Sequence, residues 1–249
     1  MKNLLLVLFI GITINMAVGQ DNKSGYSITL KSGLTLANTV GPAVESETMI
    51  NGEPPMNFYA NNPAGSKFKT GMDYALQFDY RFGKHFSLGI GTSYLPKGAE
   101  LKPVTAWWDG EGKYIVDGKS KIEQNYITVD LPLTFYFPIK QNDIFFQGGY
   151  FLGHLINSKE EGNFGIDGVK YNYVNDRGAN KNESGIFLGG GYIHSLKKSR
   201  SSMLVEMIWS RSLSHSYGAN RIPFASIYHN QTISFNIGYR YSFRFKKMA

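Results

Sequence analysis

The chain has 249 residues, a formal net charge of +7 and no cysteine. Its length fits one domain or two small ones, and the lack of cysteine excludes disulfides, thiol catalysis and cysteine-based zinc sites. Mean hydropathy is slightly negative, and after Gln20 no apolar run reaches the ~18 residues of a membrane-spanning helix, which excludes a helical membrane protein. Aromatic residues at 14% and 28 glycines favour β-structure with tight turns.

Residues 1–19 are predicted to form a secretory signal peptide, which leaves 20–249 as a single domain. Lys2 precedes an apolar stretch at 4–14, and small residues occupy the positions before a cleavage site at Gln20. The apolar stretch is too short to cross a membrane as a helix. We therefore expect an exported protein that is stabilised without disulfides.

Eight segments alternate apolar and polar residues, which is the period-2 pattern of β-strands with two different faces. The last segment, for example, presents seven apolar residues on one face, five of them aromatic. The fifth and sixth segments are more apolar and less clearly two-faced. The predicted strands are 25–36, 69–82, the segment from Phe86, 122–137, 144–156, 184–196, 202–213 and 232–245.

The connections between these strands alternate between short and long. The short ones are 83–85, 138–143 and 197–201, and the long ones are 37–68, 98–121, 157–182 and 214–230. In an up-and-down meander, this alternation places all short turns and both termini at one end. Short periplasmic turns and long extracellular loops are typical of bacterial outer-membrane barrels. The sequence thus predicts an all-β fold, an eight-stranded antiparallel up-and-down transmembrane β-barrel with four long extracellular loops.

Two of the long loops contain an Asp-Gly pair between β-forming residues, at 117–118 and at 167–168. Asp-Gly is a strong signal for a two-residue hairpin turn. We therefore expect these loops to be partly β-ribbon above the membrane.

The strand face opposite the apolar one carries few charges and many small residues, which suits the filled interior of a barrel better than the surface of a soluble protein. The apolar face would then meet lipid, with Tyr and Trp near the strand ends in interfacial girdles. A secreted, soluble lipocalin-like carrier remains an alternative, because its strands alternate in the same way. The acids and bases that we expect to pair in the lumen as a structural network are Asp73, Asp79, Arg81, Asp130, Glu206 and Arg240, with Lys31 and Arg244 on the same face.

Several phrases in the sequence carry a family resemblance. They are NYITVDLPLTFYF at 125–137, GIFLGGGY at 185–192 and the closing NIGYRYSF at 236–243. With these phrases the chain resembles the PorT-type outer-membrane β-barrel family of Bacteroidota over residues 21–249. The resemblance implies the barrel fold, and protein secretion for the namesake of the family. Barrels of this sort usually end on the terminal aromatic residue, whereas KKMA follows Phe245 here.

Candidate chemical groups are sparse. The phrase SLSHSY places Ser212, Ser214 and Ser216 beside His215, with His229 nearby, but adjacency along a loop is not catalytic geometry. His85, His154 and His194 lie in a turn or near strand ends. No metal-ligand spacing and no phosphate loop occur, so no metal and no cofactor are expected. Trp107 and Trp108 are a candidate loop platform for binding sugar or protein.

The excess positive charge is scattered over short turns and the tail, which argues against nucleic-acid binding. We expect a monomer in the bacterial outer membrane with periplasmic termini, in contact with outer-membrane lipid. Its expected role is non-enzymatic, a structural or interaction role through the long loops, with an unidentified envelope protein or secretion complex as partner. The alternative is an outer-membrane lipid-modifying enzyme or hydrolase.

Overall fold

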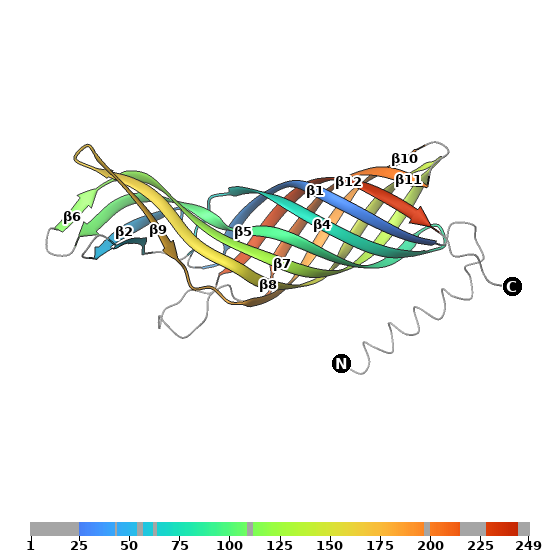
Figure 1. Cartoon of the computed structure of the whole chain (residues 1–249), viewed down its shortest axis with the longest axis horizontal. Helices are drawn as coiled ribbons and strands as arrows, with labels where there is room; N and C mark the ends of the chain where they lie inside the picture. The colour runs from blue at the N-terminus through green and yellow to red at the C-terminus, as the bar shows by residue number, and fades with distance from the viewer. Residues whose placement is uncertain are drawn as a thin grey trace.

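The computed structural model describes residues 25–42, 44–53, 57–61, 64–108, 112–196, 200–214 and 228–243, and most of them form β-strands. All twelve strands belong to one sheet (Figure 1). No helix in these ranges is long and apolar enough to span a membrane. The strands are β1 Gly25–Val40, β2 Glu47–Glu53, β3 Asn57–Ala60, β4 Lys69–Phe82, β5 Phe86–Trp108, β6 Gly112–Ile115, β7 Asp117–Ile139, β8 Asn142–Ile166, β9 Val169–Asp176, β10 Asn182–Ser195, β11 Ser201–Ser212 and β12 His229–Phe243.

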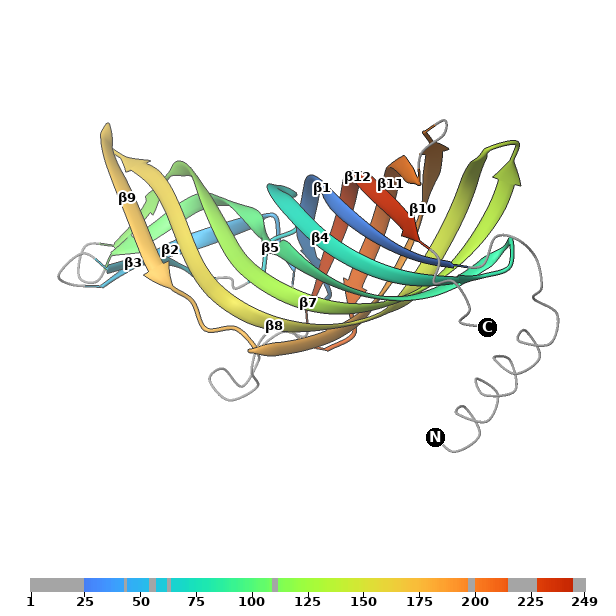
Figure 2. The same cartoon turned by 45° about the vertical axis from the view of Figure 1, so that its right-hand side comes forward.

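Eight of the strands pair antiparallel into a closed ring. The order is β1, β4, β5, β7, β8, β10, β11 and β12, and each strand pairs with the next along the chain. The first and last strands close the ring, in register from Tyr26 opposite Phe243 to Val40 opposite His229. Figures 1 and 2 show these strands tilted around a common axis, with the turns at one end.

The two faces of the ring strands differ as the alternation predicts. Bulky apolar side chains point outward and are exposed, for example Leu30 at 62% and Ile237 at 65%. Small, polar and charged side chains point inward, and Lys31 and Glu206 are each only 6% exposed. A lipocalin-like carrier would bury its apolar face inside the barrel, so that alternative does not fit this arrangement.

Three of the ring strands continue beyond the ring and carry a second region of sheet, which we call the extension. It comprises the distal parts of β5, β7 and β8 together with β2, β3, β6 and β9, and it lies at the left in Figures 1 and 2. Strand β2 pairs parallel to β5, which a simple meander does not predict. Gly98 has a φ of +104° in β5, where the chain passes from the ring to the extension.

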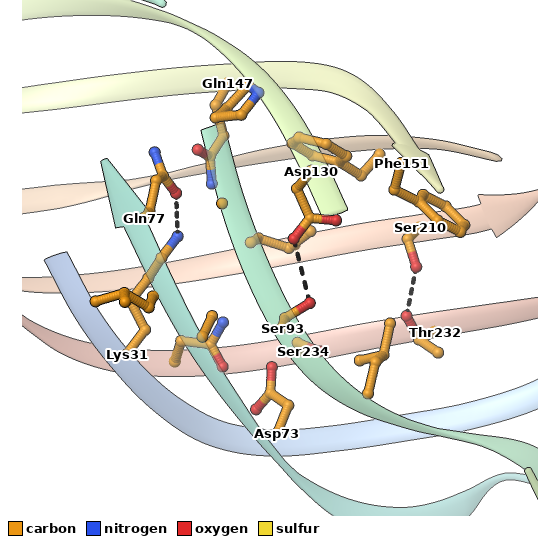
Figure 3. Close-up of a pocket in the computed structure, with 18 residues that line it drawn as sticks. Lys31, Asp73, Gln77, Ser93, Asp130, Gln147, Phe151, Ser210, Thr232 and Ser234 are labelled. Carbon is orange, nitrogen blue, oxygen red and sulfur yellow. Dashed lines mark hydrogen bonds between the residues drawn. The ribbon is translucent and has the colours of Figure 1, made fainter. Parts of the chain in front are cut away.

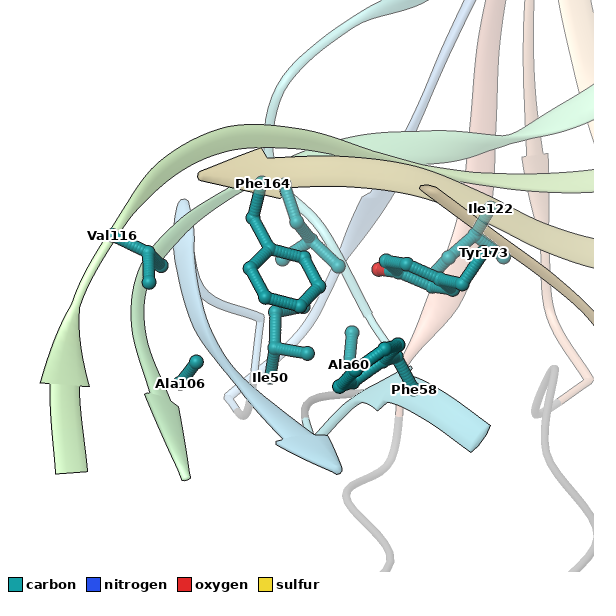
Figure 4. Close-up of a cluster of buried hydrophobic side chains, with 9 residues drawn as sticks. Ile50, Phe58, Ala60, Ala106, Val116, Ile122, Phe164 and Tyr173 are labelled. Atoms are coloured by element: carbon teal, nitrogen blue, oxygen red, sulfur yellow. The ribbon is translucent and has the colours of Figure 1, made fainter. Parts of the chain in front are cut away.

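The extension has an apolar core of its own. Ile50 on β2 and Phe58 on β3 face Phe164 on β8 and Tyr173 on β9 (Figure 4). The Phe58 and Phe164 rings pack edge to face with centroids 5.1 Å apart. All nine residues of this core are at most 6% exposed. Because the two sides of the sheet curl towards each other, this region is a folded unit and not a set of separate loops.

One of the two predicted Asp-Gly turns is confirmed and the other is wrong. Asp167 and Gly168 join β8 and β9 with φ values of 49° and 83°, as a type I′ turn requires. Asp117 and Gly118 instead begin β7 and pair with β8. Strand β6 already pairs antiparallel with the end of β5, so the chain reverses before Asp117. The predicted signal peptide, most of loop 214–230, and Arg244 lie outside the described residues.

Candidate functional site

The interior of the ring contains a central cavity of about 70 Å³. Inward-facing side chains of β1, β4, β5, β7, β8, β10, β11 and β12 line it (Figure 3). Its charged residues are Lys31, Asp73 and Asp130, and polar groups such as Gln77 and Gln147 complete the wall. The volume suits a few water molecules, since one water needs only ~10–15 Å³ by this measure.

A buried ion pair borders this cavity. Lys31 Nζ lies 2.9 Å from Glu206 Oε1 and donates to Gln77 Oε1 at 2.7 Å. Glu206 also accepts from Gln147 Nε2 at 2.9 Å and from Asn236 Nδ2 at 3.1 Å. Three other strands, β4, β8 and β12, therefore supply donors or acceptors to this pair of β1 and β11, and both charges are hydrogen bonded, as burial requires.

The network continues towards the end with the short turns. Gln77 Nε2 donates to Asp79 Oδ1 at 2.8 Å, and Asp79 Oδ2 accepts from Arg240 Nη2 at 3.0 Å. Arg240 also donates to the hydroxyls of Tyr136 at 2.9 Å and Ser27 at 3.0 Å. Hydrogen bonds thus run without a break from the cavity to Arg240. Tyr136, Phe145, Ile193 and Leu204 form a buried apolar cluster beside this network.

Only three of the six predicted lumen residues, Glu206, Asp79 and Arg240, belong to this network. Asp79 and Arg240 pair with each other, whereas Arg81 pairs with Asp143 at 2.8 Å nearer the short turns. Glu206 pairs with Lys31. Asp73 and Asp130 have no cationic partner within the described parts of the chain.

These two unpaired aspartates have different surroundings. Asp130 accepts from Thr128 at 2.8 Å and from Ser93 at 3.2 Å. Asp73 is 5% exposed, and its Oδ1 has no hydrogen-bond partner. Both line the central cavity, and Asp73 also has the side chains of Ser234 and Asn236 as hydrogen-bond neighbours.

A second buried pair, between Lys97 and Glu183, was not predicted from the sequence. The two side chains are at most 1% exposed, and Lys97 Nζ lies 4.3 Å from the Phe151 ring centroid. Asn230 donates to Glu183 at 3.3 Å and to Gln124 at 3.0 Å. The positions of these residues along their strands place the cluster between the cavity and the extension. Lys97 is the last residue of the predicted segment from Phe86, where alternation assigns it to the polar face, but it was not among the predicted lumen residues, and Glu183 lies just outside a predicted strand.

Glu160 is a second unpredicted hub, within the extension. It forms an ion pair with Arg177, and its Oε1 accepts from the Ala60 backbone N–H at 2.6 Å and from the Tyr173 hydroxyl at 3.1 Å. Asn175 and Arg177 donate to the carbonyl oxygens of β3. Side chains of β8 and β9, together with Arg177 directly after β9, therefore satisfy backbone groups at the outer edge of β3, where no other described strand pairs.

A charged cluster surrounds Lys69 where the extension begins. Lys69 is 2% exposed, and its Nζ lies 3.9 Å from Glu123 Oε1. Burial lowers the pKa of Lys69 to about 8, although the charge of Glu123 opposes the shift. Lys121 and Lys159 also pair with Glu123. The positive charge of Lys121 repels that of Lys69 and so lowers the Lys69 pKa further.

The candidate catalytic residues do not assemble as a nucleophile and base in the described ranges. His229 Nδ1 donates to the Ser214 carbonyl oxygen at 3.2 Å, while the Ser214 hydroxyl lies 3.2 Å from that of Ser212. His154 bonds to the Asn182 amide oxygen at 2.8 Å. His85 Nδ1 donates to the Tyr136 carbonyl oxygen at 3.0 Å, and His194 is exposed on β10. His215 and Ser216 lie outside the described residues.

The predicted loop platform is placed only in part. Trp107, on β5 in the extension, is 43% exposed, and the Trp108 side chain is outside the description. Among the described residues, no group of three or more His, Asp or Glu side chains is arranged to hold a metal ion.

A closed strand ring with an apolar exterior and a polar, hydrogen-bonded interior defines a membrane β-barrel as a class of protein. Residues 18–218 match the model of the family described as the outer membrane protein beta-barrel domain. This match covers most of the chain, and the protein belongs to that family. It is therefore an outer-membrane β-barrel protein of bacteria.

Solved structures with a similar course of the chain include three bacterial proteins. The outer membrane protein OprG from Pseudomonas aeruginosa is 10% identical, with 91% of this chain and 99% of that chain covered and a TM-score of 0.44. Neisserial surface protein A is 8% identical, with 88% and 98% covered and a TM-score of 0.41. The attachment invasion locus protein Ail of Yersinia pestis is 11% identical, with 87% and 99% covered and a TM-score of 0.36. The comparison with curated proteins finds no match.

Proposed function

We propose that the eight-strand ring crosses the outer membrane as a closed barrel, with the extension outside the cell and the short turns and both termini in the periplasm. In this orientation the protein is a non-enzymatic anchor that presents the extension to partners. The PorT-type assignment and an accessory role in an envelope or secretion complex belong to the same proposal.

The height of the exposed apolar belt supports the membrane placement. On β12 the outward apolar residues run from Ile233 to Phe243, a distance of about 33 Å along a strand at ~3.3 Å per residue. A strand tilt of ~35–45° reduces this to a height of about 25 Å, which is the thickness of the apolar band of outer-membrane barrels. The extension lies beyond this belt.

The extension carries the functional part of the proposal. A loop that only connected two strands would not need a buried apolar core or a hydrogen-bonded hub. Here β2, β3 and β8 pack Ile50, Phe58 and Phe164 in a core outside the belt, and Glu160 of β8 bonds to the Ala60 N–H of β3 and pairs with Arg177, which follows β9. Its stable surface, which includes Trp107 and Ile115, suits an interaction role.

The interior of the ring supports a structural role for the lumen. The ion pairs of Lys31, Lys97 and Arg240 connect strands that are not neighbours in the ring, and the apolar cluster around Tyr136 lies between the central cavity and the short turns. Eight strands leave an interior that side chains can fill. We propose that these pairs hold the barrel together and do not form a transport path, and that the protein is a monomer.

Single-cysteine labelling tests the orientation, and the absence of native cysteine makes each label unambiguous. Ile115→Cys lies in the extension, where the native side chain is 91% exposed, and Gln141→Cys lies in an exposed short turn. A membrane-impermeant maleimide should label Ile115→Cys on intact cells, and Gln141→Cys only after the outer membrane is permeabilised.

The control for membrane placement is Leu30→Cys, on the outward face of β1. Its label should be low in both conditions and should appear after solubilisation and denaturation. Labelling of Gln141→Cys on intact cells, with Ile115→Cys protected, would reverse the proposed orientation. Labelling of all three positions on intact cells or in a soluble fraction would refute the membrane placement.

A further inference from the structure

The end of the ring with the short turns opens into a vestibule of about 560 Å³. Strand ends and two of the turns line it, with Ser27, Asp143 and Ser242 among the polar residues. This volume lies within the ~300–1,000 Å³ typical of ligand pockets. The vestibule is closed towards the lumen by Tyr136, which lies between Arg81, 4.0 Å from its ring centroid, and Arg240, at 5.6 Å.

The charge of the vestibule is strongly one-sided. Among the described residues, four bases line it, Arg81, Lys140, Arg200 and Arg240, against one acid, Asp143. Asp143 already pairs with Arg81, and Arg240 pairs with Asp79 further inside. Lys140 and Arg200 are both exposed, and neither forms an ion pair with another described residue. Two positive charges at the mouth are thus available to a ligand.

Backbone pairing fixes the positions from which these two side chains project. Lys140 occupies a two-residue turn between β7 and β8, with a φ of 55°, and the flanking residues Ile139 and Asn142 pair with each other. The Arg200 carbonyl oxygen accepts from the Ser242 backbone N–H at 2.8 Å, which fastens this residue to β12. Preorganised charges bind with a smaller loss of conformational entropy than charges on free loops.

We propose that this vestibule is a docking site for a carboxylate-rich peptide segment of a partner protein. Guanidinium and ammonium groups pair with carboxylates, and the Gln141 amide and the Ser195 hydroxyl add neutral hydrogen-bond groups to the wall. A pocket of this size accepts several side chains of an extended peptide. The proposal deepens the proposed function, because the orientation given above would place this partner in the periplasm.

A peptide fits the position of the vestibule better than the phosphate of a membrane lipid. The inward-facing residues Ser27, Arg81 and Arg240 form the polar part of its wall, and the outward-facing Tyr26 and Phe243 reach only its apolar edge, so these bases lie inside the circle of strand ends. Lipid headgroups would surround the outside of that circle, where outward residues such as Tyr80 and Tyr241 are found. A peptide can enter along the axis of the ring.

Binding of fluorescein-labelled octaglutamate to the full-length purified protein in neutral detergent, measured by fluorescence anisotropy, tests the proposal. The double substitution K140Q/R200Q should weaken binding by about tenfold or more, a loss of about 1.4 kcal/mol. The charge-matched control K113Q/K170Q, on exposed positions of the extension, should change it less than about twofold. Binding to the unchanged protein should weaken with rising sodium chloride, and octaglutamine should not bind.

The proposal is overturned if K140Q/R200Q binds octaglutamate as the unchanged protein does, if both double variants lose affinity equally, or if octaglutamine binds as well. It is also overturned if the vestibule substitutions reduce retention of phosphatidylglycerol by the protein but not peptide binding, since that result identifies a lipid site. Unchanged heat-modifiable mobility verifies folding of each variant, and R200Q alone replaces the double variant if the latter does not fold. Binding in detergent does not depend on orientation, whereas the cysteine labels test only orientation, so the two proposals fail separately.

Discussion

Replacing Lys31 by methionine should destabilise the protein more than replacing its partner Glu206 by glutamine. The Lys31 ammonium lies 2.9 Å from the Glu206 carboxylate, and the side chains are 6% and 1% exposed. Removing one member of a buried ion pair typically costs about 3–5 kcal/mol, because the other charge is left uncompensated. The two substitutions differ in what remains around that charge.

K31M removes the only base that lines the central cavity within the described chain. Glu206, Asp73 and Asp130 then remain without a cation, so we expect the full loss of about 3–5 kcal/mol. E206Q leaves the ammonium bonded to Gln77 at 2.7 Å and in a cavity with two aspartates. Its expected cost is about 1–3 kcal/mol, close to that of a lost charged hydrogen bond.

Urea unfolding in detergent micelles, followed by tryptophan fluorescence and by heat-modifiable gel mobility, measures both losses. K113M, on an exposed position of the extension, is the control and should be neutral within about 0.5 kcal/mol. If E206Q costs as much as K31M or more, the aspartates of the cavity do not compensate Lys31. If both variants lose less than about 1 kcal/mol, the interior is solvated and the argument from burial is refuted.

Three other substitutions test separate features. Lys69→Met should stabilise the protein at pH 7 by up to about 3 kcal/mol, because burial lowers the Lys69 pKa from 10.5 to about 8 and the folded state bears this cost below pH 8. Between pH 8 and 10.5 the unfolded state binds more protons than the folded state, so the free energy of unfolding of the unchanged protein should rise with pH. The stability advantage of Lys69→Met should therefore shrink over this range. A difference in free energy of unfolding that stays constant with pH, measured by urea unfolding, would contradict this. Glu160→Gln should open the extension by weakening its pair with Arg177, at a cost of about 3 kcal/mol, and limited proteolysis should then cut the extension while the heat-modifiable mobility of the ring stays unchanged. Gly33→Ala should destabilise the protein by about 1–3 kcal/mol, since the added Cβ would lie 2.1 Å from a carbonyl oxygen of β12. Gly178→Ala is the control, because its Cβ would meet open space. Equal effects of the two substitutions on the urea midpoint would contradict the close packing of β1 against β12.

The strands of the ring could be predicted because each of them separates an apolar environment from a polar one. The predicted limits 69–82 coincide with β4, and the inward positions of Asp79, Glu206 and Arg240 follow from period 2 alone. Alternation assigns a side chain to a face, but it does not give the height of that side chain along the axis. For this reason only Asp79 and Arg240, of the six predicted lumen residues, pair with each other, and Lys31, rather than an arginine, is the partner of Glu206.

The extension was beyond prediction from local pattern. Strands β3 and β6 have four residues each, too few for a periodic signal, and β2 pairs parallel with a strand some fifty residues away in sequence. The Asp-Gly pair at 167–168 could be recognised because turn type depends on local backbone angles. The bond from the Ala60 N–H to Glu160, by contrast, joins residues 100 positions apart and depends on how the sheet curls.

The central claim is that the first and last strands close the ring, and a disulfide across β1 and β12 tests it directly. Thr35 and Ser234 face each other with their hydroxyl oxygens 2.9 Å apart, and both are buried. With no native cysteine, T35C/S234C should oxidise to an intramolecular disulfide in outer-membrane fractions, whereas T29C/S234C, offset by about 20 Å at ~3.3 Å per residue, should not. A gel shift that reverses with reductant, in the first variant only, is the predicted result. Failure of the first pair to cross-link, or equal cross-linking of both, would contradict the closed ring in this register.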